Sequence, residues 1–156
     1  MSRYAFSRSV AIAASPQRVL ERITRFPEWR AWSPFEGADP ELRRTYRGAE
    51  QGAGAIYEWS GNAQAGAGIM TITSATDSRV TIELQFLRPF KSVSHHTFDV
   101  VPDGAATRVT WTMAGELKGF TGWLMRVMMP MEKGLGPQFE RGLAALKRVV
   151  EHESAD

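Results

Sequence analysis

Residues Val80 to Phe86 read VTIELQF and form the clearest strand pattern in the chain. Its even positions carry apolar side chains and its odd positions carry polar ones. Successive side chains of a strand point to opposite faces, so this pattern predicts a strand with one face in a core and the other in water. Short connections between similar segments indicate an antiparallel meander that is covered on one face only. The similar segments are residues 41–47, 55–61, 68–74, 94–100 and 108–113.

A further strand and two short helical segments are expected before this meander. The segment from Tyr4 to Ile12 keeps most of its apolar residues at even positions, so it is predicted to be a half-buried strand. Ser15 followed by Pro16 is typical of a helix start, and Pro27 is expected to end that helix. Residues 27–35 are rich in aromatic side chains between prolines, which predicts a short helix or a compact turn.

The last third of the chain changes to a helical period. Apolar residues recur every three or four positions from Phe120 to Val150, which predicts a long amphipathic helix. Pro130 and Pro137 lie within this pattern, so a kink or a break is expected near them. Pro137 is predicted to begin the firm part of the helix, because proline suits the first helical position.

Length and composition restrict the class of protein. The chain has 156 residues, a formal net charge of +2 and no cysteine. A single domain over residues 1–153, with a frayed tail at 154–156, is expected from this length and the polar end. The lack of cysteine excludes disulfides and cysteine-ligated zinc, and so small a net charge does not favour binding to nucleic acid.

Membrane spans, metals and cofactors are not expected either. No stretch reaches the roughly 20 apolar residues that a membrane span needs. The apolar run at residues 10–14 is shorter than the core of a signal peptide, and a cytoplasmic location is therefore predicted. His95 and His96 are adjacent on a predicted strand and point to opposite faces, and His152 lies near the end, so no metal site is predicted.

Several motifs, taken in order, resemble one family. Residues 26–34 read FPEWRAWSP and residues 107–115 read TRVTWTMAG, and both follow the Ser15-Pro16 opening in the family's order. The sequence resembles the SRPBCC (START-like, Bet v 1-like) superfamily, in particular its polyketide cyclase/dehydrase-like branch. The resemblance implies an α+β helix-grip fold, in which a curved antiparallel sheet with two short helices after its first strand wraps around a long C-terminal helix. Members bind hydrophobic small molecules in a cavity between sheet and helix, and some catalyse cyclisation, dehydration or hydrolysis.

Residues on the predicted concave face are candidates for lining such a cavity. They share the apolar parity of the strands or the apolar stripe of the helix, and core packing is the alternative for each of them singly. Trp29 and Trp32 either cap the mouth of the cavity or fix the short helices to the core. The predicted lining is Trp32, Tyr46, Tyr57, Trp59, Met70, Ile82, Leu84, Phe86, His96, Phe98, Trp111, Met113, Trp123, Met128 and Phe139.

Two polar members of this set are candidates for catalysis. His96 shares parity with Phe98 and Val100, and an imidazole can exchange protons near neutral pH. Tyr57, or Tyr46 in its place, could donate a hydrogen bond to a carbonyl or hydroxyl group of a ligand. A core histidine bonded to a neighbour is the alternative for His96, because the sequence shows no orienting partner for it.

The leading functional hypothesis is a protein that binds a hydrophobic or aromatic small molecule, lipid- or polyketide-like, between sheet and helix. The first alternative is a cyclase- or dehydratase-like enzyme that uses His96 and a tyrosine as acid and base. The second is an accessory protein whose methionine-rich segment, residues 125–131, docks a partner or forms a homodimer.

Overall fold

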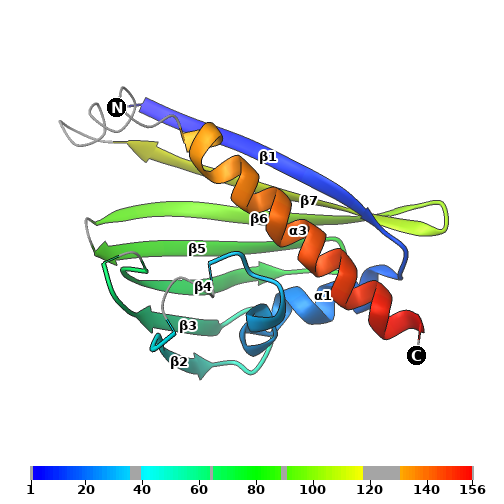
Figure 1. Ribbon diagram of the computed structural model, residues 1–156, viewed down its shortest axis with the longest axis horizontal. Coiled ribbons are helices and arrows are strands. Elements are labelled where there is room, and N and C mark those ends of the chain that lie inside the picture. The colour runs from blue at the N-terminus through cyan, green and yellow to red at the C-terminus, as the bar shows by residue number, and fades with distance from the viewer. Residues whose placement is uncertain (1, 36–39, 64, 89–90, 118–130, 156) are drawn as a thin grey trace.

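A computed structural model describes residues 2–35, 40–63, 65–88, 91–117 and 131–155. Within these ranges the chain forms a seven-stranded sheet, two α-helices and a short 3-10 helix, which confirms the predicted helix-grip class (Figure 1). The helices are α1 (Pro16–Thr24), η1 (Phe26–Ala31) and α3 (Met131–Ala155). The strands are β1 (Ser2–Ile12), β2 (Arg43–Gly48), β3 (Ala55–Ser60), β4 (Ala67–Ala75), β5 (Arg79–Arg88), β6 (Ser92–Asp103) and β7 (Ala106–Leu117).

The strands pair antiparallel in the order β1-β7-β6-β5-β4-β3-β2. Strands β2 to β7 follow one another along the chain as the predicted meander. Strand β1 joins this meander at β7, with Tyr4 opposite Gly115 and Ile12 opposite Thr107. The first and the last strand of the chain are therefore neighbours at one side of the sheet, where β1 forms the edge (Figure 1).

Strand β5 shows how the alternation in sequence produces a sheet with one covered face. Val80 and Ile82 have no exposed surface and point to the concave face, whereas Leu87 has the opposite parity and is 41% exposed. Burying the apolar side chains of one parity stabilises the strand, and the other parity needs only to be compatible with water.

The first helix begins as the sequence predicts. Ser15 Oγ accepts a hydrogen bond from the Arg18 amide at 3.4 Å, and Pro16 occupies the first helical position. Val19 and Ile23 are fully buried against the core. The polar cap and the buried stripe together explain why so short a segment stays helical.

The two tryptophans of η1 and its C-terminal end hold the short helices together. Trp29 Nε1 donates to the carbonyl of Ile23 at 2.8 Å, and Trp32 Nε1 donates to the carbonyl of Arg22 at 3.1 Å. Both indoles are buried. These are the contacts expected of tryptophans that fix short helices to a core.

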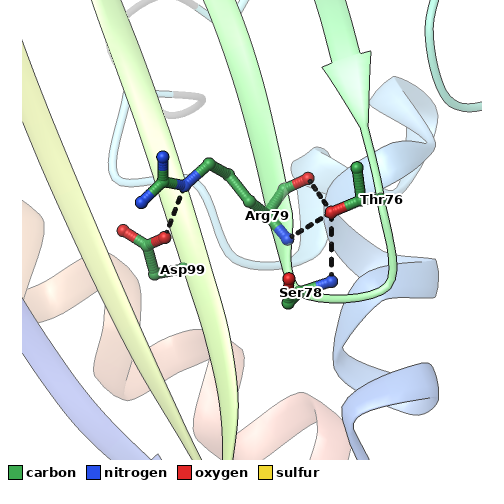
Figure 2. A network of polar contacts seen from close by, with 4 residues as sticks. All are labelled: Thr76, Ser78, Arg79 and Asp99. Atoms are coloured by element: carbon green, nitrogen blue, oxygen red, sulfur yellow. Dashed lines mark hydrogen bonds and ion pairs between the residues drawn. The ribbon is translucent and has the colours of Figure 1, made fainter.

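The β4–β5 hairpin is closed by a turn whose polar groups also contact β6 (Figure 2). Thr76 Oγ1 accepts hydrogen bonds from the amides of Ser78 at 3.3 Å and Arg79 at 3.0 Å. Arg79 Nε donates to Asp99 Oδ1 at 2.7 Å, and the amide of Val100 donates to the carbonyl of Ser78 at 2.8 Å. These bonds hold three neighbouring strands in register at one end of the sheet.

Pro137 lies inside α3 rather than at its start, which corrects the sequence prediction. The helix is unbroken from Met131 to Pro137, although a proline in a helix interior costs about 3 kcal/mol by removing an amide hydrogen. Burial outweighs this cost, because each buried large apolar side chain contributes about 1.5–3 kcal/mol. The nearly inaccessible side chains of this helix are Phe139, Leu143, Leu146 and Val150.

Helix α3 crosses the concave face along β1 and ends beside α1 (Figure 1). Polar contacts flank its apolar stripe: Arg8 Nε donates to Glu140 Oε1 at 3.0 Å. Nearer the end of the helix, Glu151 Oε2 accepts a hydrogen bond from the Ala13 amide at 2.7 Å. These contacts fix the helix to β1 and to Ala13, the residue that follows the strand.

Candidate functional site

One row of residues crosses the concave face from one sheet edge to the other. Each member is the register partner of the next on the neighbouring strand, so the row contains one residue from each of the seven strands. It combines apolar side chains with hydroxyl and phenol groups, a mixture typical of small-molecule sites. This Tyr4 row consists of Tyr4, Gly115, Ser94, Leu84, Met70, Tyr57 and Tyr46.

The next row toward the centre of the sheet is more completely buried. Exposed fractions in this row fall from 8% at Phe6 to 0% at Ile82. In the Tyr4 row, by contrast, Tyr4, Leu84 and Met70 all keep partial exposure. Accessible apolar surface on the concave face therefore lies at the Tyr4 row. The buried row consists of Phe6, Met113, His96, Ile82 and Ile72.

His96 is buried and has a hydrogen-bonding partner at each ring nitrogen. Trp111 Nε1 lies 3.0 Å from His96 Nδ1, and Ser94 Oγ lies 3.4 Å from His96 Nε2. An indole nitrogen can only donate, so Nδ1 accepts and carries no hydrogen. Burial lowers the pKa of His96 to about 4, with a smaller effect from the nearby His95. The ring is therefore neutral at pH 7 and carries its hydrogen on Nε2.

The hydrogen bonds continue from His96 through Ser94 to Tyr4. The hydroxyl of Ser94 is hydrogen-bonded to the phenol of Tyr4. Burial raises the pKa of Tyr4, and the hydrogen bond with Ser94 opposes this rise. We call this series of residues the polar chain; its members are Trp111, His96, Ser94 and Tyr4. It links a buried indole to a partly exposed phenol across β7, β6 and β1.

Gly115 makes room for the last step of the polar chain. It lies between Tyr4 and Ser94 in the Tyr4 row. A Cβ atom at this position would lie 2.6 Å from Tyr4 Oη and 2.8 Å from Tyr4 Cζ, closer than unbonded atoms approach. Because the glycine has no side chain, the phenol ring can extend over it and reach Ser94.

Five of the predicted lining residues pack tightly in the core. Trp111 stacks on Phe139 with ring centroids 3.8 Å apart and an angle of 6° between the planes, and Phe98 stacks on Trp111 at 5.0 Å. Their side chains contact one another, and a role for them in ligand binding stays a prediction. The five, none more than 2% exposed, are Trp32, Ile82, Phe98, Trp111 and Phe139.

Other predicted lining residues keep accessible surface. Tyr46, at the β2 edge, is 39% exposed, whereas Tyr57, Met113 and His96 keep only 5–7%. The partly exposed members lie on neighbouring strands of the concave face and are Trp59 on β3, Met70 on β4, and Leu84 and Phe86 on β5. Trp123 and Met128 lie outside the described residues.

The two catalytic candidates are not neighbours in the sheet. Tyr57 is on β3 and His96 is on β6, three strands away, which is about 14 Å along the sheet. The Tyr57 ring is instead stacked between Tyr46, at a centroid distance of 5.3 Å, and Trp59, at 6.0 Å. This arrangement does not favour direct proton transfer between Tyr57 and His96.

A groove of about 340 Å³ lies where η1 approaches the β2–β3 hairpin. Of the residues that line this groove, only Tyr46 belongs to the cavity lining predicted from the sequence. The other residues come from η1 and the residue before it, from the end of β2, from the β2–β3 turn and from the start of β3, and no periodic pattern joins them into a site. The groove is lined by Arg25, Phe26, Pro27, Glu28, Tyr46, Arg47, Gly48, Ala49, Glu50, Ala55 and Ile56.

Tyr4 and Ser94 are not among the site residues that the sequence predicts. The available signal was parity: Tyr4 shares the apolar parity of Phe6, and Ser94 shares that of His96. Their proximity depends on the pairing of β1 with β7, which the alternation within each strand does not specify.

Two negative findings concern the described residues alone. Nowhere in residues 2–35, 40–63, 65–88, 91–117 and 131–155 do three or more His, Asp or Glu side chains gather closely enough to hold a metal ion. Across the same ranges, no helix combines the length and the apolar character that crossing a membrane would require.

The fold resembles solved structures over almost its whole length. TTHA0849 from Thermus thermophilus is 21% identical with a TM-score of 0.67, covering 97% of this chain and 99% of that one. Ara h 8.0201 is 10% identical with a TM-score of 0.64, covering 96% and 98%. The Aha1 dimer from Colwellia psychrerythraea is 13% identical with a TM-score of 0.66, covering 95% and 96%. At these identities the similarity shows the fold alone.

Comparison at the level of sequence adds the family. No curated protein matches the chain. A family model described as polyketide cyclase / dehydrase and lipid transport matches residues 3–151. The matched span contains every strand that forms the concave face, the whole polar chain and most of α3. The chain therefore belongs to the polyketide cyclase/dehydrase and lipid transport family, within the SRPBCC (START-like, Bet v 1-like) superfamily.

Proposed function

We propose that this protein binds a hydrophobic or aromatic small molecule, lipid- or polyketide-like, between the concave face of the sheet and α3. The observation that carries the proposal is accessible apolar surface beside a buried polar group. Leu84 and Met70 are partly exposed, and both lie in the same row as the buried Ser94. A ligand that covered this surface would gain about 25 cal/mol for each Å² of apolar area removed from water.

Family membership supports the same proposal. The family is described by polyketide cyclisation or dehydration and by lipid transport, and both activities require an apolar molecule to be held. The aromatic side chains of Trp59 and Phe86, with ring centroids 5.8 Å apart, extend the partly exposed surface beyond the Tyr4 row. Aromatic rings offer a ligand large contact area with little loss of side-chain freedom.

Two alternatives stay predictions. A cyclase- or dehydratase-like enzyme would use His96 with Tyr57 or Tyr46, but a pKa near 4 makes His96 a weak base at neutral pH. An accessory protein would use the methionine-rich segment 125–131, of which residues 125–130 lie outside the described part of the chain. A homodimer is one form that this second alternative could take, and the Colwellia structure is described as a dimer.

The proposal is tested with a neutral apolar dye, N-phenyl-1-naphthylamine, whose fluorescence rises in apolar surroundings. Leu84→Glu places a carboxylate on the concave face and is expected to weaken dye binding at least about tenfold, because a charge is costly to bury. Leu87→Glu is the matched control, since Leu87 lies on the same strand, has the opposite parity and is 41% exposed.

Saturable dye binding that Leu84→Glu weakens and Leu87→Glu preserves would support the proposal. Circular dichroism establishes that both variants fold. Equal binding by the two variants, or a signal that never saturates in the wild type, would contradict it.

A further inference from the structure

The polar chain has a direction, which is set by its buried end. Trp111 Nε1 is a donor and cannot accept, so the hydrogen bond to His96 Nδ1 runs from Trp111 to His96. A neutral imidazole then has its remaining hydrogen on Nε2, which faces Ser94 Oγ at 3.4 Å. Hydrogen donation therefore proceeds from the core outward along these first two bonds.

Ser94 extends this direction to Tyr4. Ser94 is 4% exposed, so its hydroxyl hydrogen needs an acceptor within the protein. If Ser94 Oγ accepted from both His96 and Tyr4, its own hydrogen would be left without an acceptor, at a cost of about 1–3 kcal/mol. Donation from Ser94 to the Tyr4 oxygen avoids this cost, and it agrees with the lowering effect of this bond on the pKa of Tyr4.

The hydrogens of Trp111, His96 and Ser94 are then each donated to the next member of the polar chain. The hydroxyl hydrogen of Tyr4 is left to be donated to a group outside the polar chain. Tyr4 is partly exposed, and its phenol lies over Gly115 in the row that also holds Leu84 and Met70. A group that meets this hydrogen must be a hydrogen-bond acceptor. A group that can only donate would face another donor and lose its own hydrogen bond on burial.

We propose that Tyr4 selects the ligand by donating a hydrogen bond to a carbonyl-type oxygen, so that the site prefers an apolar ketone or quinone over a hydrocarbon or an N–H compound of the same shape. This inference rests on the proposed function, because it names the chemical class of molecule that the same surface would bind. Tyr4 is thus a specificity-determining residue, positioned by Ser94 and Gly115 and oriented by a donor at the far end of the chain.

Three planar molecules of one shape test this proposal: fluorene, which has no polar group, 9-fluorenone, which only accepts, and carbazole, which donates through its N–H. Each is titrated against N-phenyl-1-naphthylamine on the wild type, Tyr4→Phe and the control Ser7→Ala, which removes an exposed hydroxyl from the opposite face of the same strand. In the wild type, fluorenone is expected to bind about five- to tenfold more tightly than fluorene, the effect of one neutral hydrogen bond. Tyr4→Phe should abolish this preference and leave fluorene unchanged, whereas Ser7→Ala should preserve it.

The outcomes separate this inference from the proposed function. If fluorene and fluorenone bind equally, or if Tyr4→Phe keeps the ketone preference, the inference is overturned and the apolar site remains. If none of the three molecules displaces the dye and the dye itself does not saturate, the proposed function fails and the inference fails with it. If the dye binds but none of the three displaces it, the ketone preference is overturned and the proposed function stands.

A measurement without any ligand tests the direction of hydrogen-bond donation along the polar chain. The nitrogen-15 chemical shifts of the His96 ring at pH 7 distinguish the hydrogen on Nε2 from the hydrogen on Nδ1. A hydrogen on Nε2 is expected and supports the direction from Trp111 to Tyr4. A hydrogen on Nδ1, or a doubly protonated ring, would reverse or break the chain and overturn the inference.

Discussion

The indole of Trp111 on β7 and the phenyl ring of Phe139 on α3 lie face to face, with centroids 3.8 Å apart and planes 6° from parallel. This stack joins the long helix to β7, the strand next to the edge strand β1. Phe139 also contacts Phe6 on the edge strand β1, at a centroid distance of 5.1 Å. One helical side chain therefore links two strands that are far apart in the sequence.

Replacing Phe139 by alanine is expected to lower the free energy of unfolding by about 3–5 kcal/mol, because a cavity would remain beside Trp111. Urea denaturation followed by circular dichroism measures this loss. Phe35→Ala is the control, since Phe35 is 43% exposed and its loss should change stability by about 0.5 kcal/mol or less. Similar losses in the two variants would show that α3 is not fixed through this stack.

His96 makes stability depend on pH. Its pKa falls from 6.5 to about 4 in the folded protein, so the unfolded chain binds a proton in this window that the folded protein does not. The contribution of His96 to stability is therefore complete above pH 6.5 and is lost as the pH falls toward 4. The free energy of unfolding is expected to decrease by up to about 3 kcal/mol through this window.

The comparison of His96→Asn with the wild type isolates this effect. Asparagine can still accept from Trp111 but does not titrate, so the decrease between pH 6.5 and 4 should become shallower in urea denaturation. His152→Asn should keep the slope of the wild type, because this side chain is exposed. An unchanged slope in His96→Asn would show that the imidazole is not held neutral by burial.

Gly115→Ala should displace the phenol of Tyr4, since the new methyl group would lie 2.6 Å from Tyr4 Oη. A loss of about 1–3 kcal/mol in the free energy of unfolding is expected, as for other overpacked sites. In a Tyr4→Ala background the same substitution should cost at least about 1 kcal/mol less, because the space over Gly115 is then free. Additive losses in this double-mutant cycle would mean that Tyr4 does not lie over the glycine.

Glu151→Ala should expose the amide of Ala13, which donates to Glu151 Oε2 at 2.7 Å. Hydrogen exchange at this amide is expected to become faster, because it loses its acceptor at the end of β1. Glu50→Ala, at an exposed position between β2 and β3, is the control and should leave exchange at Ala13 unchanged. If the Ala13 amide is equally protected from exchange in the wild type and both variants, its acceptor is a group other than Glu151.

Strand parity alone predicted which face of several strands is buried. The period of two in residues 80–86 and 94–100 correctly assigned Ile82, His96 and Phe98 to the buried face. Parity is a property of one strand and needs no knowledge of its neighbours, which is why it can be read from a single sequence. The superfamily and the helix-grip class were predicted correctly as well.

The polar chain could not be predicted in the same way. Its contacts join residues on different strands, and they depend on register as well as on parity. The sequence therefore showed no orienting partner for His96, although Trp111 lies 3.0 Å from its Nδ1 in the structure. The local preference of proline predicts a helix start at Pro137. This prediction is wrong, because the burial of Phe139 and Leu143 stabilises the helix in spite of the proline.

The pairing of β1 with β7 determines the order in which the protein can be completed during synthesis. Arg3 and Glu116 form an ion pair although they are 113 residues apart in the chain. The strands between β2 and β6 can pair across short connections as they leave the ribosome, because closing a short loop costs less entropy than closing a long one. Strand β1 emerges first but has no partner until β7 is made. Its apolar side chains, among them Phe6 and Ile12, remain uncovered until then, so the nascent chain is expected to be a client of chaperones that shield apolar segments.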